Sequence, residues 1–126
     1  MKRLFRQSLK DSIKGLRFAF ETEKNIRIHT IMFIMVLILG LVMGANTLEL
    51  ALIILTSGQV IVAELINTAI ENLVDVKVYG AYHPLARVAK DVAAAGVLFA
   101  AIISIVLGVI IFASIVLRNG WILEIL

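Results

Sequence analysis

Residues 62–75 read VAELINTAIENLVD, an apolar run that carries three acids, Glu64, Glu71 and Asp75. At about 100° per residue, Glu71 and Asp75 each fall within about 20° of Glu64 on a helix. A charge at mid-span costs roughly 2.5–3.5 kcal/mol, whereas each Leu, Ile or Val returns only about 0.3–0.6 kcal/mol. The stretch therefore predicts a membrane helix with one acidic stripe, because the surrounding apolar residues can offset one buried acid.

The rest of the chain is equally apolar. Of its 126 residues, 61% are hydrophobic, and none is cysteine, which excludes disulfides and thiol catalysis. Three apolar runs, at about 28–45, 48–73 and 92–117, are long enough to cross a bilayer. We therefore expect an all-α integral membrane protein with three transmembrane helices, and short connections that leave room for only one domain, residues 1–126.

The segment before the first span predicts an amphipathic helix at about residues 4–24. Its apolar residues recur every three to five positions with cations between them, which is typical of a helix lying on a membrane surface. Most Lys and Arg residues lie in this segment and in the loop before the third span, so both are expected to be cytoplasmic, with the C-terminus outside. The net charge of +3 indicates attraction to anionic lipid rather than to nucleic acid.

The third span has two features of its own. Pro84, the only proline, predicts that the helix begins there, and Arg87, Lys90 and Asp91 can then face one site. Further along, small residues recur every four positions, which predicts close helix packing within or between subunits. They are Gly96, Ala100, Ser104 and Gly108.

The acidic stripe permits several functions. The acids could pair with cations of other helices, or they could form a proton or ion path, as in a small ion transporter or a membrane assembly subunit. Such a path would not cross the bilayer, because residues 48–56 offer only Glu49 at the far end. Carboxylates near cations at one interface suit phosphoryl transfer to a lipid hydroxyl, although the sequence contains no phosphate-binding loop of known type.

Two segments add a family resemblance. ELINTAIENLVD (64–75) and YHPLARVAKD (82–91) closely resemble the signature of the prokaryotic diacylglycerol kinase family, E-x-x-N-[ST]-[SA]-x-E-x-x-x-D followed by Y-H-x-L-x-x-x-A-K-D. The flanking segments TEKNIRIH (22–29) and HPLARVAKDVAAAGVL (83–98) resemble the Gram-positive branch, whose members phosphorylate undecaprenol. The resemblance implies a homotrimeric kinase of the bacterial cell membrane that uses ATP with Mg²⁺.

The resemblance also implies roles for individual residues. Glu64 is similar in position to the base that accepts the hydroxyl proton, and Asn67 lies beside it. Glu23 and Glu71 would bind the metal. The nucleotide would be bound by Asp75, Tyr82, His83, Lys90 and Asp91, and Lys10 and Lys14 are candidates for phosphate contacts.

The motifs leave the acceptor open. Undecaprenol is the expected substrate, and diacylglycerol is the alternative, because acceptor choice depends on an apolar surface that the motif residues do not describe. The transporter or assembly subunit remains the alternative from another functional class.

Overall fold

The computed structural model describes residues 4–126, with residue 122 described by its backbone alone; residues 1–3 of the predicted domain lie outside this range. Its helices are α1 (Phe5–Thr22), α2 (Lys24–Val42), α3 (Thr47–Val78), α4 (Pro84–Arg118) and α5 (Trp121–Ile125). Among the described residues, α2, α3 and α4 are long and apolar enough to cross a membrane. The predicted fold class, three membrane helices preceded by a separate amphipathic helix, is confirmed.

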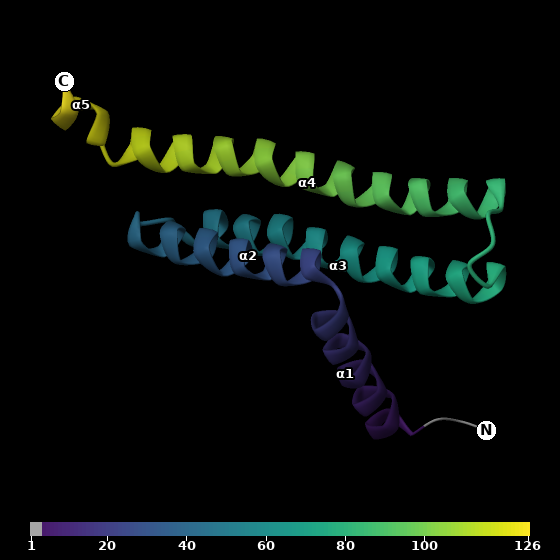
Figure 1. Cartoon of the computed structure of the whole chain (residues 1–126). Helices are drawn as coiled ribbons and strands as arrows, with labels where there is room; N and C mark the ends of the chain where they lie inside the picture. The colour runs from purple at the N-terminus through teal and green to yellow at the C-terminus, as the bar shows by residue number, and fades with distance from the viewer. Residues whose placement is uncertain (1–3) are drawn as a thin grey trace.

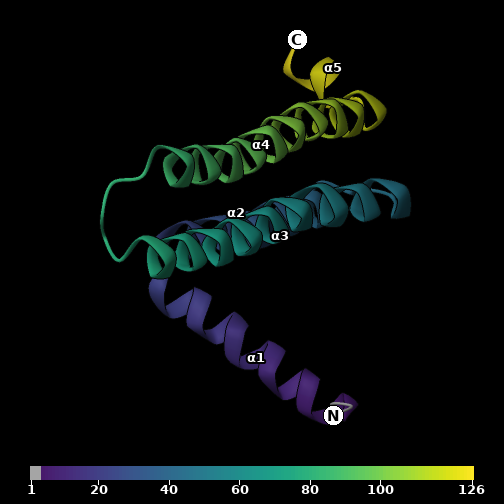
Figure 2. The ribbon, with the colours of Figure 1, turned by 90° about the vertical axis from the view of Figure 1, so that its right-hand side faces the viewer.

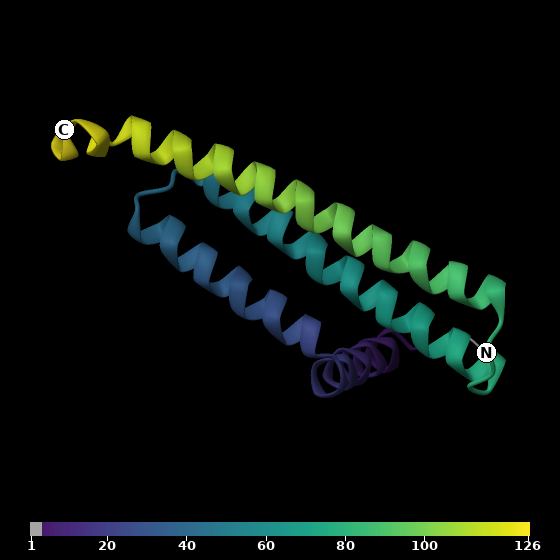
Figure 3. The same ribbon diagram turned by 45° about the horizontal axis from the view of Figure 1, so that its top comes forward.

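The long helix α3 lies between α2 and α4 and contacts both (Figure 3). The helix α1 extends from the start of α2 on the side away from α4 (Figures 1 and 2). Large apolar side chains are exposed along all three long helices. An exposed apolar surface of this extent suits a bilayer, where contact with lipid carries no hydrophobic penalty.

Glu23 separates α1 from α2. Its backbone is extended, with φ −110° and ψ 111°, so α1 ends at Thr22 rather than at residue 24. Arg27 stabilises the bend, because its Nη1 donates to the carbonyl oxygens of Phe20 at 2.7 Å and Glu21 at 3.2 Å. These carbonyls belong to the last turn of α1, which has no further helical donors of its own. The bend therefore holds Glu23 at the junction of the two helices.

The turn between α2 and α3 is tightly specified. Gly44 has a φ of +84°, a conformation that L side chains rarely adopt, and α2 ends at Val42, three residues before the predicted boundary. Asn46 then caps α3: its Oδ1 accepts from the Glu49 backbone N–H at 2.9 Å, and the Asn46 backbone N–H donates to Glu49 Oε2 at 2.8 Å. This reciprocal pair is a capping box.

The end of α4 closes over the same turn. Arg118 pairs with the Glu49 carboxylate and donates to the Gly44 carbonyl at 2.9 Å. Asn119 Nδ2 donates to the Met43 carbonyl at 2.7 Å. We call these contacts the C-terminal clamp.

The most buried part of the core lies near the clamp. It consists of Ile53, Ile111 and Ile115, with partly buried side chains packed around them. On the neighbouring helix α2, Gly40 lies so close to α3 that an added Cβ would come within 2.8 Å of Ile53 Cδ1. A closely packed core therefore lies at this end, and the opposite ends of α3 and α4 contribute no residue to it.

Candidate active site

The acidic stripe runs along α3 from the interior of the molecule to its surface. Glu64 is only 4% exposed, Glu71 is partly buried, and the Asp75 side chain is 62% exposed. At 1.5 Å per residue, Glu71 lies about 10 Å along the helix from Glu64, and Asp75 about 6 Å further. Three acids of similar chemistry thus occupy three different environments.

Glu64 meets a side chain that the sequence analysis did not single out. His29 on α2 brings its Nε2 to 3.4 Å from Glu64 Oε1, and the imidazole is largely buried. In the sequence, His29 is a polar side chain at the start of an apolar span and the last residue of the family-like segment 22–29. Nothing in the periodicity of α2 indicated which residue of α3 it would face.

Asn67 and Glu71 form the next contact along α3. Asn67 Nδ2 donates to Glu71 Oε1 at 3.2 Å. The Oδ1 of Asn67 is buried and has no hydrogen-bond partner in the described part of the chain, and the same holds for Oγ1 of Thr68. Buried polar atoms are usually satisfied, so an unpaired carbonyl oxygen beside a carboxylate is a natural point of contact for a ligand.

Glu23 joins this group from the α1–α2 bend. Its carboxylate and that of Glu71 both lie close enough to Glu64 to repel its negative charge. Glu71 also acts electrostatically on Lys90, which lies on α4. We call Glu23, Glu64, Asn67 and Glu71 the acidic cluster; Glu71 connects it to α4.

The acidic cluster contains oxygen atoms of the kind that bind a hard divalent cation such as Mg²⁺. Among the described residues, no three His, Asp or Glu side chains converge tightly enough to hold a metal ion alone. Nucleotide-bound Mg²⁺ usually takes only one or two carboxylates, with phosphates and water as its other ligands. Glu23, Glu71 and the unpaired Oδ1 of Asn67 supply oxygen ligands of this type, so the residues fit.

Beyond Glu71, the open ends of α3 and α4 enclose a groove of about 460 Å³, which we call the α3–α4 groove. Its volume is within the usual range for small-molecule sites. The residues predicted to bind the nucleotide all line it, namely Asp75, Tyr82, His83, Lys90 and Asp91, together with Arg87.

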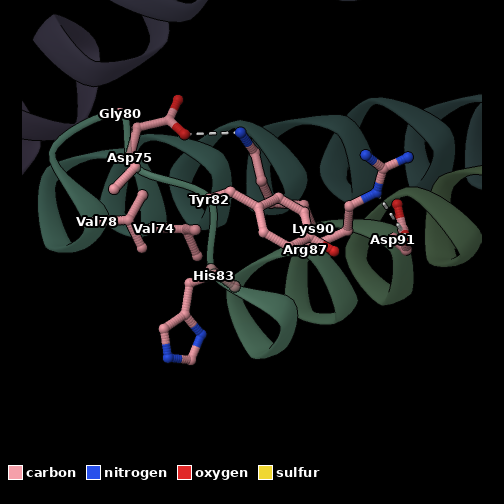
Figure 4. A pocket seen from close by; sticks show the side chains of 11 residues that line it. Val74, Asp75, Val78, Gly80, Tyr82, His83, Arg87, Lys90 and Asp91 are labelled. Carbon is pink, nitrogen blue, oxygen red and sulfur yellow. Dashed lines mark hydrogen bonds and ion pairs between the residues drawn. The ribbon is translucent and has the colours of Figure 1, made fainter.

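Two ion pairs organise the groove (Figure 4). Lys90 Nζ donates to Asp75 Oδ1 at 2.7 Å, which joins α4 to α3, and Arg87 Nε lies 4.0 Å from Asp91 Oδ2. Tyr82 is exposed on the connecting loop. The groove thus offers cations, carboxylates and an aromatic ring on a solvent-accessible surface.

His83 has a structural role as well. Its Nδ1 accepts the Leu85 backbone N–H at 3.2 Å, which caps α4, and Pro84 follows at the first helical position as predicted. In Figure 4 its ring lies on the side away from the Asp75–Lys90 pair. Capping of α4 is therefore one structural reason for a histidine at this position of the Y-H-x-L motif.

Two predicted contacts lie elsewhere. Lys10 and Lys14 are exposed on α1, which leads away from α3 and α4 (Figure 1). The structure therefore brings together the predicted site residues of the α1–α2 bend, of α3 and of the start of α4. It does not bring Lys10 and Lys14 close to them.

Comparison with known proteins identifies the family. The model of the prokaryotic diacylglycerol kinase family matches residues 10–112. A diacylglycerol kinase of Synechocystis sp. is 42% identical over 94 residues, which are 75% of this chain and 54% of that protein, so the chain spans about half the length of this relative. An undecaprenol kinase of Bacillus subtilis is 38% identical over 99 residues, 79% of this chain and 80% of that protein. A diacylglycerol kinase of Escherichia coli is 30% identical over 95 residues, 75% of this chain and 77% of that protein.

These relatives are named as lipid kinases, and the match covers all three membrane helices up to residue 112. The predicted class, a membrane lipid kinase with ATP as phosphate donor, is thereby confirmed at the level of the family. The chain belongs to the prokaryotic diacylglycerol kinase family.

Proposed function

We propose that this chain transfers the γ-phosphate of ATP directly to the hydroxyl of a membrane lipid alcohol, and that undecaprenol is the acceptor. The observation that carries the proposal is the graded acidic stripe on α3, with buried Glu64 at one end and the Asp75–Lys90 pair at the groove. A lipid hydroxyl would approach from the bilayer and a nucleotide from water. In this proposal, the acidic stripe lies across the boundary between bilayer and water.

The roles follow the order of residues along α3. Glu64 is the base that accepts the hydroxyl proton, and Asn67 orients the reactants one turn away. The α3–α4 groove holds the nucleotide, with Asp75, Tyr82, His83 and Asp91 around the nucleoside. Lys90 lies near both Asp75 and Glu71, where its ammonium group would neutralise phosphate oxygens.

In the reaction, the lipid oxygen attacks the γ-phosphorus as its proton passes to Glu64, and the bond to the β-phosphate oxygen breaks in line. Glu23 and Glu71 would hold Mg²⁺, which supplies charge neutralisation for the phosphates when bound. Glu64 is well placed as the base, because it is sheltered from water, while the α3–α4 groove lies further along the same helix.

The base role predicts a clean loss of function. Glu64→Gln should abolish turnover, because an amide cannot accept the proton, and should leave assembly intact, because the side chain keeps its size. Phosphate transfer from labelled ATP, measured beside the elution volume in detergent, would test this. Near-normal activity in the variant would remove Glu64 from the base role.

The proposed acceptor rests on the resemblance of residues 22–29 and 83–98 to the Gram-positive branch. The relatives carry both substrate names, so the acceptor needs its own assay. The experiment compares undecaprenol and diacylglycerol at equal mole fraction in mixed micelles with MgATP. Preference for undecaprenol supports the proposal, and preference for diacylglycerol keeps the chemistry but overturns the acceptor.

We also propose that the active protein is a homotrimer in the bacterial cell membrane, with the N-terminus and the α3–α4 groove cytoplasmic and the C-terminus outside. The single domain comprises residues 1–126. In support of assembly, Gly96 and Gly108 meet no atom that an added Cβ would contact, so these two positions of the small-residue ridge are open to another subunit, whereas Ala100 and Ser104 of the ridge face the other helices of this chain. Native mass spectrometry of the detergent-solubilised protein would count the subunits; a monomer with full activity would contradict the trimer.

A further inference from the structure

The contact between His29 and Glu64 is unused by the proposed mechanism. Glu64 is nearly inaccessible to solvent, and its Oε1 lies 3.4 Å from Nε2 of His29. The two residues lie on different helices, α2 and α3, so the contact depends on how these helices pack. A buried carboxylate needs a partner, because leaving it unpaired carries a large desolvation cost.

The charges around Glu64 make His29 the favourable neighbour. Glu23 and Glu71 both repel a negative charge on Glu64, whereas the imidazole of His29 presents a ring nitrogen that can donate a hydrogen bond to the carboxylate. These acids approach from the α1–α2 bend and from α3, while His29 approaches from α2. In the described part of the chain, His29 is the side chain that the structure pairs with the Glu64 carboxylate.

His29 also borders a small, mostly apolar cavity that contains two hydroxyl groups. The residue borders a cavity of about 70 Å³ between α2, α3 and α4, which Ser57 and Ser104 also line. A cavity of this size with hydroxyl groups can hold water. A partner for the second ring nitrogen would define which nitrogen carries the proton and would keep the ring oriented.

We propose that His29 is a positioning residue that holds the Glu64 carboxylate, keeping one oxygen on the imidazole and leaving the other to accept the hydroxyl proton. The inference rests on the proposed role of Glu64 as the base. Contacts of 3.4 Å are common in unliganded sites and shorten when the reactants are bound. His29 itself receives no proton from the lipid in this scheme.

The test replaces the hydrogen-bonding group while keeping its volume. His29→Phe retains a ring without a donor, and His29→Gln retains an N–H donor on a side chain that cannot become charged. General-base catalysis is worth about 10²–10⁴-fold, and misorienting the base forfeits part of this. We expect His29→Phe to lower kcat about 10–100-fold with an unchanged KM for ATP, and His29→Gln to recover most of the loss.

Two controls separate the possible causes. Met32→Leu alters a neighbouring side chain on the same cavity that makes no polar contact, and it should retain wild-type kcat. His29→Leu, a smaller apolar change, replaces His29→Phe if the latter does not elute as the wild-type assembly does. Glu64→Gln is measured in parallel, because an inactive Glu64→Gln variant supports the assignment of Glu64 as the base.

Each outcome decides a different point. Normal kcat in the apolar variant that assembles, beside an inactive Glu64→Gln, overturns the role of His29 and leaves the base in place. Equal losses in His29→Phe and His29→Gln, or a raised KM for ATP in both, also overturn it, because packing would then explain the effect. An active Glu64→Gln overturns the base assignment itself.

Discussion

Individual residues of the same type differ in this site because their surroundings differ. Glu64 is enclosed by helices, while Asp75, eleven positions further along the same face, is open to solvent and paired with Lys90. A sheltered carboxylate suits proton acceptance from an alcohol, and an exposed one suits the ordering of a cation. Acids of one stripe can therefore serve different substrates, the buried one a lipid hydroxyl and the exposed one a nucleotide.

Lys90 carries a prediction of this kind. Lys90→Gln should reduce kcat/KM for ATP by about 10²-fold or more. In the proposed mechanism, the ammonium group of Lys90 neutralises the negative charge that develops on the phosphates, and the variant lacks it. Thermal stability should hardly change, since exposed ion pairs contribute little. Steady-state kinetics with varied ATP, together with a melting curve in detergent, would measure both.

Two companion variants sharpen the comparison. Lys77→Gln removes an exposed lysine from α3 that does not line the α3–α4 groove, so ATP kinetics should be unaffected. Asp75→Asn breaks the same ion pair but leaves the ammonium, so it should cost less activity than Lys90→Gln. Equal losses of kcat/KM together with equal drops in melting temperature in the two variants would make the pair structural and remove the phosphate role of Lys90.

Among the helices, α3 has two ends of different character. Its first turn is held by the capping box and the C-terminal clamp, whereas its last turns, with α4, form the open groove. About 26 residues separate Glu49 from Asp75, which is roughly 39 Å of helix. The contacts that hold the helices together and the proposed nucleotide groove therefore lie at opposite ends of α3.

This separation predicts a variant with altered stability and normal catalysis. Arg118→Leu should lower the melting temperature, because it removes the partner of a Glu49 side chain that is only 9% exposed and also leaves the Gly44 carbonyl without its donor. KM for ATP should stay unchanged, given the distance to the groove. Thermal unfolding in detergent and ATP kinetics below the transition would report the two properties.

The matched control is Arg17→Leu on α1. It also removes an Arg–Glu pair, but both side chains are well exposed, so the melting temperature should barely move. Equal shifts in the two variants would contradict a special role for the clamp. Arg118→Lys should fall between wild type and Arg118→Leu, because lysine keeps the charge but not the planar fork that reaches two acceptors.

For the whole molecule, orientation in the membrane is the main prediction. Because the chain has no cysteine, single cysteines can report accessibility without background. Lys77→Cys, near the predicted cytoplasmic loop, should react with a membrane-impermeant maleimide only after cells are opened. Leu123→Cys, exposed on α5 near the C-terminus, should react in intact cells. The reverse pattern would invert the proposed topology.

The membrane architecture could be read from the sequence because its causes are local. The length and polarity of each run determine whether it can span a bilayer, and Pro84 marks the start of α4 through its own backbone geometry. The family was equally accessible, since its two motifs each lie within a continuous segment of about a dozen residues or fewer. The acids of α3 could be placed on one face from helix periodicity alone.

The partners of those acids required the packed structure. Periodicity identifies which face of a helix is polar, but the rotation and offset of a neighbouring helix determine which side chain it meets. The His29–Glu64 contact, the Lys90–Asp75 pair and the C-terminal clamp each join residues from separate helices. Glu23 likewise acts on Glu64 from a bend between two helices, which hydrogen bonds of Arg27 to the end of α1 stabilise. Contacts between helices depend on the packing of all their side chains together, so no single segment contains enough information to specify them.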